Sequence, residues 1–351
     1  MLTIKQVQEI KEHLERAQSP IFFFDNDQDG LCSFLLLQRY LGRGKGVAVK
    51  SFPDLDASYF RKVEELSGDY IFILDKPVVS ESFFEEAHKF NIPIVWIDHH
   101  EAEKKLPEFV NYYNPLYNSE KTNEPVTALC YQITSRKEDL WLAVIGCISD
   151  RFYPSFYSEF KNQFPELSIE SEDAFDIFYK SEIGKIAKMF SFGLKDNTTN
   201  VVLMLKFLIK SGGPYDVLEK TPKNRILHER FELLSNKYRK LLNKAIDLND
   251  KSEKILFFEY GGDLSISGDL SNELSYLFPK KFIIVGYIKG IKINLSARGK
   301  NIKPLMSEAI KGLEGGRSGG HDNAVGAQMR VDDLEKFKSN LISLCSNLLL
   351  L

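Results

Sequence analysis

The chain has 351 residues, with 46 Lys and Arg against 49 Asp and Glu, which gives a formal net charge of −3. Hydrophobic residues make up 43% of the sequence and charged residues 27%, a balance that supplies a core and excludes an intrinsically disordered chain. The weakly acidic net charge argues against a bulk electrostatic binder of nucleic acid. At roughly 150 residues per domain, the length predicts two domains.

The sequence predicts a cytoplasmic protein. Its four cysteines, Cys32, Cys130, Cys147 and Cys345, form no Cys-x-x-Cys pair, which argues against structural zinc or a disulfide framework. Residues 3–18 have the pattern of an amphipathic helix rather than of a signal peptide. No apolar run in the sequence reaches the length of a membrane span, so no membrane partner is expected.

Strands and helices are predicted to alternate in the first part of the chain. Short apolar runs predict strands, and helical patterns lie between them; the strands are expected over 21–24, 46–52, 70–75 and 92–98, and the helices over 31–41 and around 80–90. This order predicts a parallel sheet with crossover helices. Three of the runs end in acid or histidine, as IFFFD, YIFILD and IVWIDHH. Because sites in such sheets lie at the carboxyl ends of strands, we expect these side chains to meet.

The rest of the chain is predicted to contain helices followed by a smaller mixed domain. Residues 137–151 have the pattern of an apolar helix that ends near Asp150, and the charged region up to 250 is expected to be helical. Further strands are predicted over 254–260, 281–288 and 292–298, with helices over 267–278 and near 332–350, the first of them starting at a Ser or Asp cap. The predicted fold is therefore α/β, with a parallel-sheet domain and flanking helices over 1–155, a helical connector over 156–250 and a smaller mixed α/β domain over 251–351.

Three carboxylates, Asp25, Asp27 and Asp29, alternate in the loop DNDQDG. Carboxylates this close repel one another unless a cation lies among them. A solvated turn is the alternative, since Asp and Asn are common in turns. An EF-hand calcium loop is disfavoured, because its twelfth position would be Leu36 instead of Glu and the preceding element is a predicted strand.

A second acidic and histidine-containing motif, Asp98-His99-His100, follows another predicted strand. Neighbouring side chains on an extended segment point to opposite sides, so one histidine can be a ligand and the other a neighbouring or substrate-contacting group. Asp75 and Asp150, taken alone, would be ordinary carboxylates at the ends of elements. Together with the loop at 25–30 they form a set of carboxylates and imidazoles that suits Mn²⁺ or Mg²⁺, and imidazole favours Mn²⁺.

A glycine-rich segment, GGRSGGHDNAVG, surrounds His321. Glycines allow backbone amides to approach an anion closely, although a flexible loop has the same composition. Between Lys280 and Arg317 the chain has nine Lys or Arg residues against two acids. A local positive patch in an acidic chain indicates a specific polyanion site, and a solvated edge strand is the plainer alternative.

These motifs, in this order, resemble the DHH phosphoesterase superfamily, specifically its branch of RecJ-like single-strand exonucleases and nanoRNase-like proteins with a DHH-associated C-terminal domain. Its four N-terminal motifs are similar to DNDQDG, to Asp75 in ILDKP, to IDHH at 97–100, and to Gly146 with Asp150 in GCISD. The glycine-histidine signature of the associated domain resembles GGHDNAVG at 319–326, and its Ser-x-Arg is matched by Ser296 and Arg298. The resemblance covers most of the chain and is weakest over 155–250.

The resemblance implies a centre of two metal ions, with Mn²⁺ as the expected metal and Mg²⁺ as the alternative. The implied ligands are Asp25, Asp27, Asp29, Asp75, His99 and Asp150, with Asp75 bridging both ions. His100 would lie beside the ligands and contact the phosphate, so His100 and Asp75 are the implied catalytic residues. A substrate phosphate would be bound from the associated domain by Arg298, Gly319, Gly320 and His321.

The implied activity is that of a Mn²⁺-dependent phosphodiesterase. It would remove nucleotides from an end of single-stranded DNA or RNA, or of short oligonucleotides, by two-metal activation of water. Two alternatives stay open: a small-nucleotide phosphatase or phosphodiesterase acting on a nucleoside bisphosphate or cyclic dinucleotide, and a non-catalytic scaffold with replication or repair protein partners. Every implied ligand position is filled, which argues against the scaffold.

Overall fold

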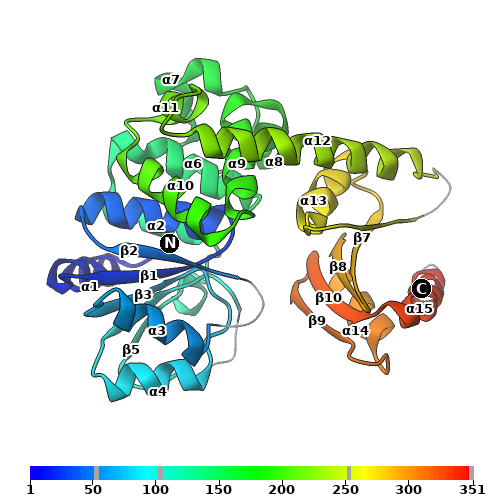
Figure 1. The fold of residues 1–351 in the computed structure, drawn as a ribbon, viewed down its shortest axis with the longest axis horizontal. Coiled ribbons are helices and arrows are strands. Elements are labelled where there is room, and N and C mark those ends of the chain that lie inside the picture. The colour runs from blue at the N-terminus through cyan, green and yellow to red at the C-terminus, as the bar shows by residue number, and fades with distance from the viewer. Residues whose placement is uncertain (51–54, 102–105, 251–253, 348–351) are drawn as a thin grey trace. The chain divides into compact units, whose positions relative to one another are not determined.

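The computed structural model describes residues 1–50, 55–101, 106–250 and 254–347. They belong to two compact units, Met1–Phe231 and Glu232–Leu351. Each unit is built on a five-stranded sheet with helices packed against it (Figure 1). The α/β fold class predicted from the sequence is confirmed.

The sheet of the first unit is parallel throughout, in the order β2-β1-β3-β4-β5. Its strands are β1 (Pro20–Asp25), β2 (Lys45–Val49), β3 (Tyr70–Leu74), β4 (Ile94–Ile97) and β5 (Val110–Tyr113). Strand β5 was not predicted from the sequence, because its four residues, VNYY, lack the apolar run of the other strands. The strand order reverses between β1 and β3, and in open sheets ligands bind outside the carboxyl ends of strands at such a point.

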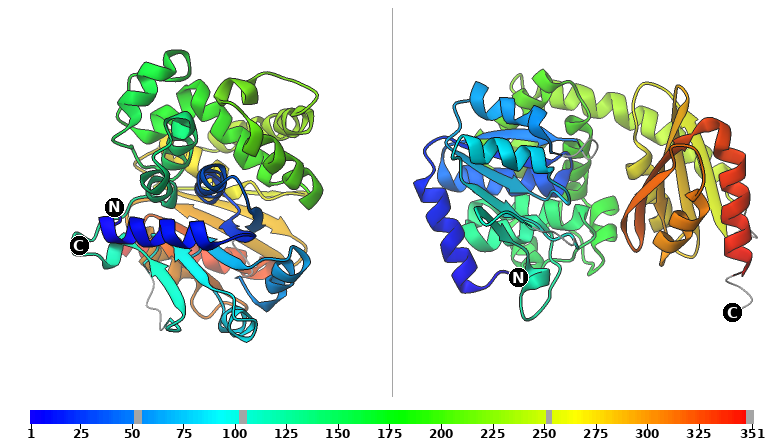
Figure 2. Two further views of the ribbon diagram at one scale, coloured as in Figure 1. Left: turned by 90° about the vertical axis from the view of Figure 1, so that its left-hand side faces the viewer. Right: turned by 90° about the horizontal axis from the view of Figure 1, so that it is seen from below.

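Helices cover both faces of this sheet (Figures 1 and 2). Phe22 and Phe24 face a layer formed by α1 (Ile4–Arg16), α2 (Gln28–Leu41), α5 (Val126–Thr134) and α6 (Leu140–Ser149). Phe23 and Trp96 face the opposite layer, α3 (Ala57–Glu65) and α4 (Glu81–Lys89). Because successive side chains of a strand point to opposite faces, a strand covered on both sides is apolar at every position.

The helices after α6 share the core of the first unit. They are α7 (Tyr157–Gln163), α8 (Ala174–Lys180), α9 (Glu182–Leu194), α10 (Thr198–Lys210) and α11 (Pro214–Leu218), and their buried side chains join the cluster that contains α2 and α6. The two units divide within α12 (Arg225–Asp247). Short 3-10 helices lie at Pro115–Tyr117, Lys137–Asp139, Pro165–Leu167 and Val331–Asp333. The domain limits at 155 and 250 stay a prediction.

A buried ion pair joins α2 to this helical layer. Nε of Arg39 lies 2.7 Å from Oδ1 of Asp139, and Nη1 of Arg39 donates to the carbonyls of Leu208, Ile209 and Ser211 at the end of α10. Burial raises the pKa of Asp139, and the charge of Arg39 opposes that rise. One guanidinium therefore satisfies a buried carboxylate and the open end of a helix together.

The second unit holds a mixed sheet in the order β6-β7-β8-β10-β9. Its strands are β6 (Ile255–Gly261), β7 (Phe282–Lys289), β8 (Lys292–Arg298), β9 (Arg317–His321) and β10 (Ala324–Arg330). Only β6 and β7 pair in parallel, among the strands that the structure describes here. Leu295 and Val325 face a core shared with α14 (Ile302–Ile310) and α15 (Leu334–Asn347), and α13 (Ser267–Leu277) packs against β7 and β8.

The structure decides two local questions in this unit. The glycine-rich segment forms a β-hairpin, with β9 and β10 joined by a two-residue turn, so the alternative of a flexible loop does not hold. Gly320 has a φ of 133°, and a Cβ there would lie 2.4 Å from the carbonyl oxygen of Ala324, so glycine permits this pairing. The predicted Ser or Asp cap of α13 is wrong: the helix follows Ile266 without a side-chain cap, because the Ser267 hydroxyl pairs with Ser296 at 2.9 Å.

All four cysteines are buried and free. Burial raises the pKa of Cys32 and Cys130, which keeps these thiols protonated and unreactive. Across the described ranges, no helix combines the length and the apolar character needed to cross a bilayer.

Asp139→Ala is expected to lower the free energy of unfolding by roughly 3–5 kcal/mol, because it leaves the buried Arg39 without its carboxylate. Urea denaturation followed by circular dichroism measures the change. Glu138→Ala is the matched control, since Glu138 is 58% exposed in its pair with Arg136. Such an exposed pair contributes less than about 1 kcal/mol. An equally small effect for Asp139→Ala would contradict the structural role of the buried pair.

Candidate metal centre

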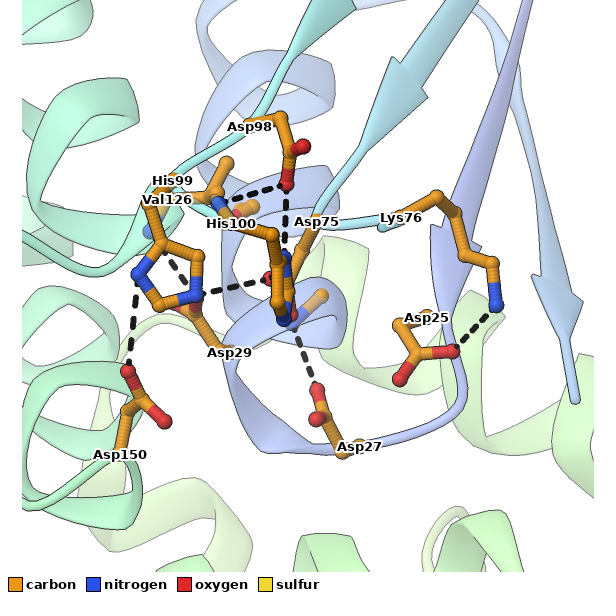
Figure 3. Close-up of polar contacts among 12 residues, drawn as sticks. Asp25, Asp27, Asp29, Asp75, Lys76, Asp98, His99, His100, Val126 and Asp150 are labelled. Carbon is orange, nitrogen blue, oxygen red and sulfur yellow. Dashed lines mark hydrogen bonds and ion pairs between the residues drawn. The ribbon is translucent and has the colours of Figure 1, made fainter. Parts of the chain in front are cut away.

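Carboxylates and imidazoles converge at the carboxyl edge of the first sheet (Figure 3). Asp25 is the last residue of β1, Asp75 follows β3 directly, and Asp98 follows β4 directly. The backbone of Asp75 has a φ of 59°, a left-handed conformation that Asp adopts more readily than most residues. Such strain at the end of a buried strand is typical of functional positions.

Asp29 is held in place by two helices. It lies in the first turn of α2 and is 3% exposed. Its two carboxylate oxygens accept hydrogen bonds from the N–H groups of Val126, at 2.9 Å, and Thr127, at 2.8 Å, where α5 begins. The hydroxyl of Thr127 donates back to the Asp29 carbonyl at 2.9 Å. Asp29 therefore caps the start of α5.

Close packing of α6 on α5 brings the last carboxylate to the site. A Cβ on Gly146 would lie 2.1 Å from Oγ1 of Thr127, so only glycine allows α6 this approach. Asp150 follows about one helical turn after Gly146, at the end of α6. The spacing of the fourth motif thus has a packing reason: the glycine sets the position of the helix and the aspartate lies at its end.

Two groups of three side chains offer metal-ligand atoms that all lie within 4.8 Å of one another in the described part of the chain. One group is Asp75, His99 and His100, and the other is Asp29, His99 and Asp150. His99 belongs to both: its Nε2 lies 3.4 Å from Oδ1 of Asp75, and its Nδ1 lies 3.9 Å from Oδ2 of Asp150. The structure thus brings together four of the six implied ligands and His100.

Asp25 and Asp27 lie outside those two groups. Oδ1 of Asp27 accepts the N–H of Gly30 at 2.9 Å and caps α2. Oδ1 of Asp25 lies 2.8 Å from Nζ of Lys76, whose side chain is 2% exposed. An ammonium group thus already supplies positive charge beside Asp25, and the ligand roles of Asp25 and Asp27 stay predictions. The EF-hand alternative is excluded, because strand β1 precedes the loop in place of a helix.

The electrostatics of the site favour a cation. Burial, followed by the charges of Asp25 and Asp29, raises the pKa of Asp27 to about 7. Burial and the surrounding carboxylates raise the pKa of Asp75 well above its usual range. Burial lowers the pKa of His99, which keeps the imidazole in the neutral form that binds metals. A divalent ion among these groups would relieve the repulsion between the carboxylates.

The geometry around one buried oxygen of Asp75 also favours a cation at this site. Asp75 is 2% exposed, and its Oδ1 accepts no hydrogen bond from the residues that the structure describes. The imidazole nitrogens beside it lie at 3.4 Å in His99 and 3.8 Å in His100, beyond ordinary hydrogen-bond distances. A buried acceptor left in this way destabilises the fold unless something else binds it. Carboxylate oxygens and imidazoles fit Mn²⁺ or Mg²⁺.

Asp98 supports the site but was missing from the site residues expected from the sequence. It is fully buried, and its Oδ1 lies 2.8 Å from Nδ1 of His100. Tyr112 donates to its other oxygen at 3.1 Å, and Asn114 donates to the His100 carbonyl at 2.9 Å. These contacts fix the orientation of the His100 imidazole. Asp98 is part of the IDHH motif, but the sequence does not tell whether its carboxylate binds a metal or orients a neighbouring histidine. The hydrogen bonds in the structure show the second role.

The expected substrate-binding residues lie in the second unit. Antiparallel pairing places Arg298 of β8, Ala324 of β10 and His321 of β9 in one row across the sheet, which we call the first row. Nε of Arg298 donates to Oδ1 of Asn272 at 2.6 Å. Gly319 and Gly320 lie in β9, which is an edge strand. In an edge strand, some backbone N–H groups point away from the sheet and are not used in strand pairing. Arg298 and His321 therefore share one face of the sheet.

Two family models match the chain: the N-terminal domain of the DHH family over residues 21–146, and the DHHA1 domain over residues 252–347. The chain belongs to the DHH superfamily. The DHH superfamily and the DHH-associated C-terminal domain expected from the motifs are confirmed. No curated protein sequence matches the chain.

Several solved structures share its fold. RecJ from Thermus thermophilus in complex with Mn²⁺ has a TM-score of 0.71 at 15% identity over 98% of this chain and 54% of that chain. This chain therefore spans about half the length of that RecJ. Exonuclease RecJ bound to manganese has a TM-score of 0.65 at 15% identity, over 99% of this chain and 95% of that one. CDC45 from Entamoeba histolytica has a TM-score of 0.52 at 11% identity, over 96% and 98%.

Gly146→Ala is expected to weaken Mn²⁺ binding by at least roughly tenfold, because the added methyl group separates α6 from Thr127 and displaces Asp150. Isothermal titration calorimetry measures the affinity. Gly268→Ala is the matched control, since a Cβ at that helical glycine meets nothing within 4 Å. Equal Mn²⁺ affinity in the two variants would contradict the link between helix packing and metal binding.

The metal-free protein is expected to lose stability as pH rises from about 4 to about 7. The pKa of Asp27 rises from its ordinary 3.8 to about 7 on folding, so the folded state alone keeps this proton within that window. Metal ligands must be deprotonated, so stabilisation by Mn²⁺ should increase over the same window. Thermal denaturation in chelator and in Mn²⁺ at several pH values measures both trends. If the difference in unfolding temperature between the Mn²⁺ and chelator samples stays constant with pH, this electrostatic account is refuted.

Proposed function

We propose that the protein is a Mn²⁺-dependent phosphodiesterase that hydrolyses single-stranded nucleic acid or short oligonucleotides from an end. The observation that carries the proposal is a pair of ligand groups that share His99, within the described part of the chain. One group adds Asp75 and His100, the other adds Asp29 and Asp150, and Oδ1 of Asp75 is buried without a hydrogen bond. The likeness in fold to exonuclease RecJ bound to manganese supports the same reaction class.

The two ligand groups would hold two metal ions. Asp25 and Asp27 would be further ligands of these ions. Divalent ions bound there supply Lewis-acid activation of water and neutralise charge on the phosphoryl oxygens. Asp75 belongs to one group, and its Oδ1 lies 3.4 Å from Nε2 of His99, the residue that both groups share. Asp75 would therefore hold the metal together with His99.

The remaining side chains would bind and orient the substrate. Asp98 and Asn114 hold His100 beside Asp75, so its imidazole is placed to contact a phosphoryl oxygen. In the second unit, Arg298 offers a planar guanidinium that matches the geometry of a phosphate. His321 lies in the same row and would contact the same phosphate.

Asp75→Asn is expected to lower Mn²⁺-dependent hydrolysis by at least roughly a hundredfold, because it removes the charge at the centre of the ligand set. Asn keeps the size of the side chain and tolerates the φ of 59°, so the variant should fold. The assay uses end-labelled DNA and RNA strands of several lengths, a dinucleotide and a nucleoside bisphosphate. Asp263→Asn, on an exposed bend of the second unit, is the control.

The products separate the proposal from its alternatives. Stepwise shortening of the longer strands from one end would support the exonuclease and give its polarity. Cleavage of only the dinucleotide or the bisphosphate would indicate a small-nucleotide enzyme. No turnover by wild-type protein with metal bound would favour a scaffold, and near-normal turnover by Asp75→Asn would overturn the assignment of the centre.

A further inference from the structure

A second row of polar side chains crosses the sheet of the second unit, on the same face as the first row. It consists of Asn294 in β8, Gln328 in β10 and Arg317 in β9, which are paired across the strands. Each lies four residues along its strand from the corresponding member of the first row, and an even offset keeps side chains on one face. We call these three residues the second row.

Hydrogen bonds connect the second row from end to end. Nη2 of Arg317 donates to Oε1 of Gln328 at 3.0 Å, and Nε2 of Gln328 donates to Oδ1 of Asn294 at 2.7 Å. The chain of bonds fixes the orientation of both amides, and Gln328 in turn orients the exposed guanidinium. The contact with Gln328 thus positions the guanidinium of Arg317 on this face of the sheet.

Two glycines leave open space between the rows. Gly326 of β10 is paired with Gly319 of β9 midway between the first and second rows. A Cβ on Gly319 would meet nothing within 4 Å, and one on Gly326 would meet only the Gly319 carbonyl oxygen, at 3.9 Å. A ligand can therefore lie directly on the backbone as it passes from one row to the other.

The distance between the rows selects the class of ligand. Four residues of extended strand span roughly 13 Å, which is too far for one phosphate to contact both rows. A stacked single strand advances about 3.4 Å per nucleotide, and an extended strand more, so roughly two to four steps, or about three to five nucleotides, cover that distance. Basic grooves that follow the backbone are the usual way to bind single strands.

We propose that Arg317, Gln328 and Asn294 form a second backbone-binding position for single-stranded nucleic acid, separated from the first row by the open glycine pair. This inference rests on the proposed function and narrows it: the substrate is a strand of several nucleotides that contacts both rows. Arg317 binds a phosphate oxygen through its guanidinium fork, and the two amides contact the adjoining sugar or phosphate.

Binding of the full-length chain to fluorescent oligonucleotides, followed by anisotropy in chelator to prevent turnover, tests the proposal. Arg317→Ala is expected to weaken binding of a hexanucleotide roughly tenfold and to reduce its salt dependence by about one phosphate contact. A dinucleotide, which cannot span both rows, should keep its affinity. Parallel DNA and RNA series show whether the sugar matters. Lys336→Ala is the matched control, because it removes the same charge from α15, on the opposite face of the sheet.

Gly326→Val gives a second, independent test. Valine suits a strand, and the space around Gly326 admits its side chain, so the variant should fold. It should obstruct the hexanucleotide and spare the dinucleotide. The proposal is overturned if Arg317→Ala matches Lys336→Ala at every length, or if it weakens the two oligonucleotides by the same factor. Retained hexanucleotide binding without Mn²⁺-dependent hydrolysis would instead contradict the proposed function and leave the second row standing.

Discussion

Carboxylates brought together in a buried place repel one another and lose their hydration, so a fold that gathers them needs a cation. The first unit is arranged around this constraint. Parallel strands deliver Asp25 and Asp75 to one edge of the sheet, while helix starts and ends deliver Asp29 and Asp150. At Asp25 the positive charge comes from the protein itself, because the ammonium group of Lys76 pairs with this carboxylate. At Asp75 the structure offers imidazoles and an unsatisfied oxygen, which is the environment that a metal ion completes.

Some residues of the first unit serve both the packing of its helices and the metal centre. Asp29 serves at once as a helix cap and as a potential ligand, so the start of α5 and the metal centre share one carboxylate. Gly146 acts through Thr127 on that same cap and, at the end of its helix, on Asp150. In the second unit, glycines have a different role. Gly319 and Gly326 carry no side chains, so the face between the two polar rows stays accessible.

Much of this arrangement could be predicted from the sequence. The strands that end in acid or histidine are short apolar runs, and parallel topology brings their carboxyl ends together, so the approach of Asp75 to His99 was predictable in outline. Asp29 and Asp150 lie at the ends of helices and were expected from their motifs. Strand β5 escaped because VNYY has neither an apolar run nor a clear alternation. The support given by Asp98 and the pairing of Lys76 with Asp25 depend on side-chain directions, which a linear pattern does not contain. The second row depends on the register of β8, β9 and β10, which composition alone does not give.

Anomalous diffraction from crystals of the full-length protein grown with Mn²⁺ tests the central claim most directly. The account predicts an anomalous peak at coordination distance from Oδ1 of Asp75, with His99 as a further ligand of the same centre. A well-ordered site without any peak beside Asp75 at saturating Mn²⁺ would contradict the account, since the buried oxygen would then have no cation to complete it.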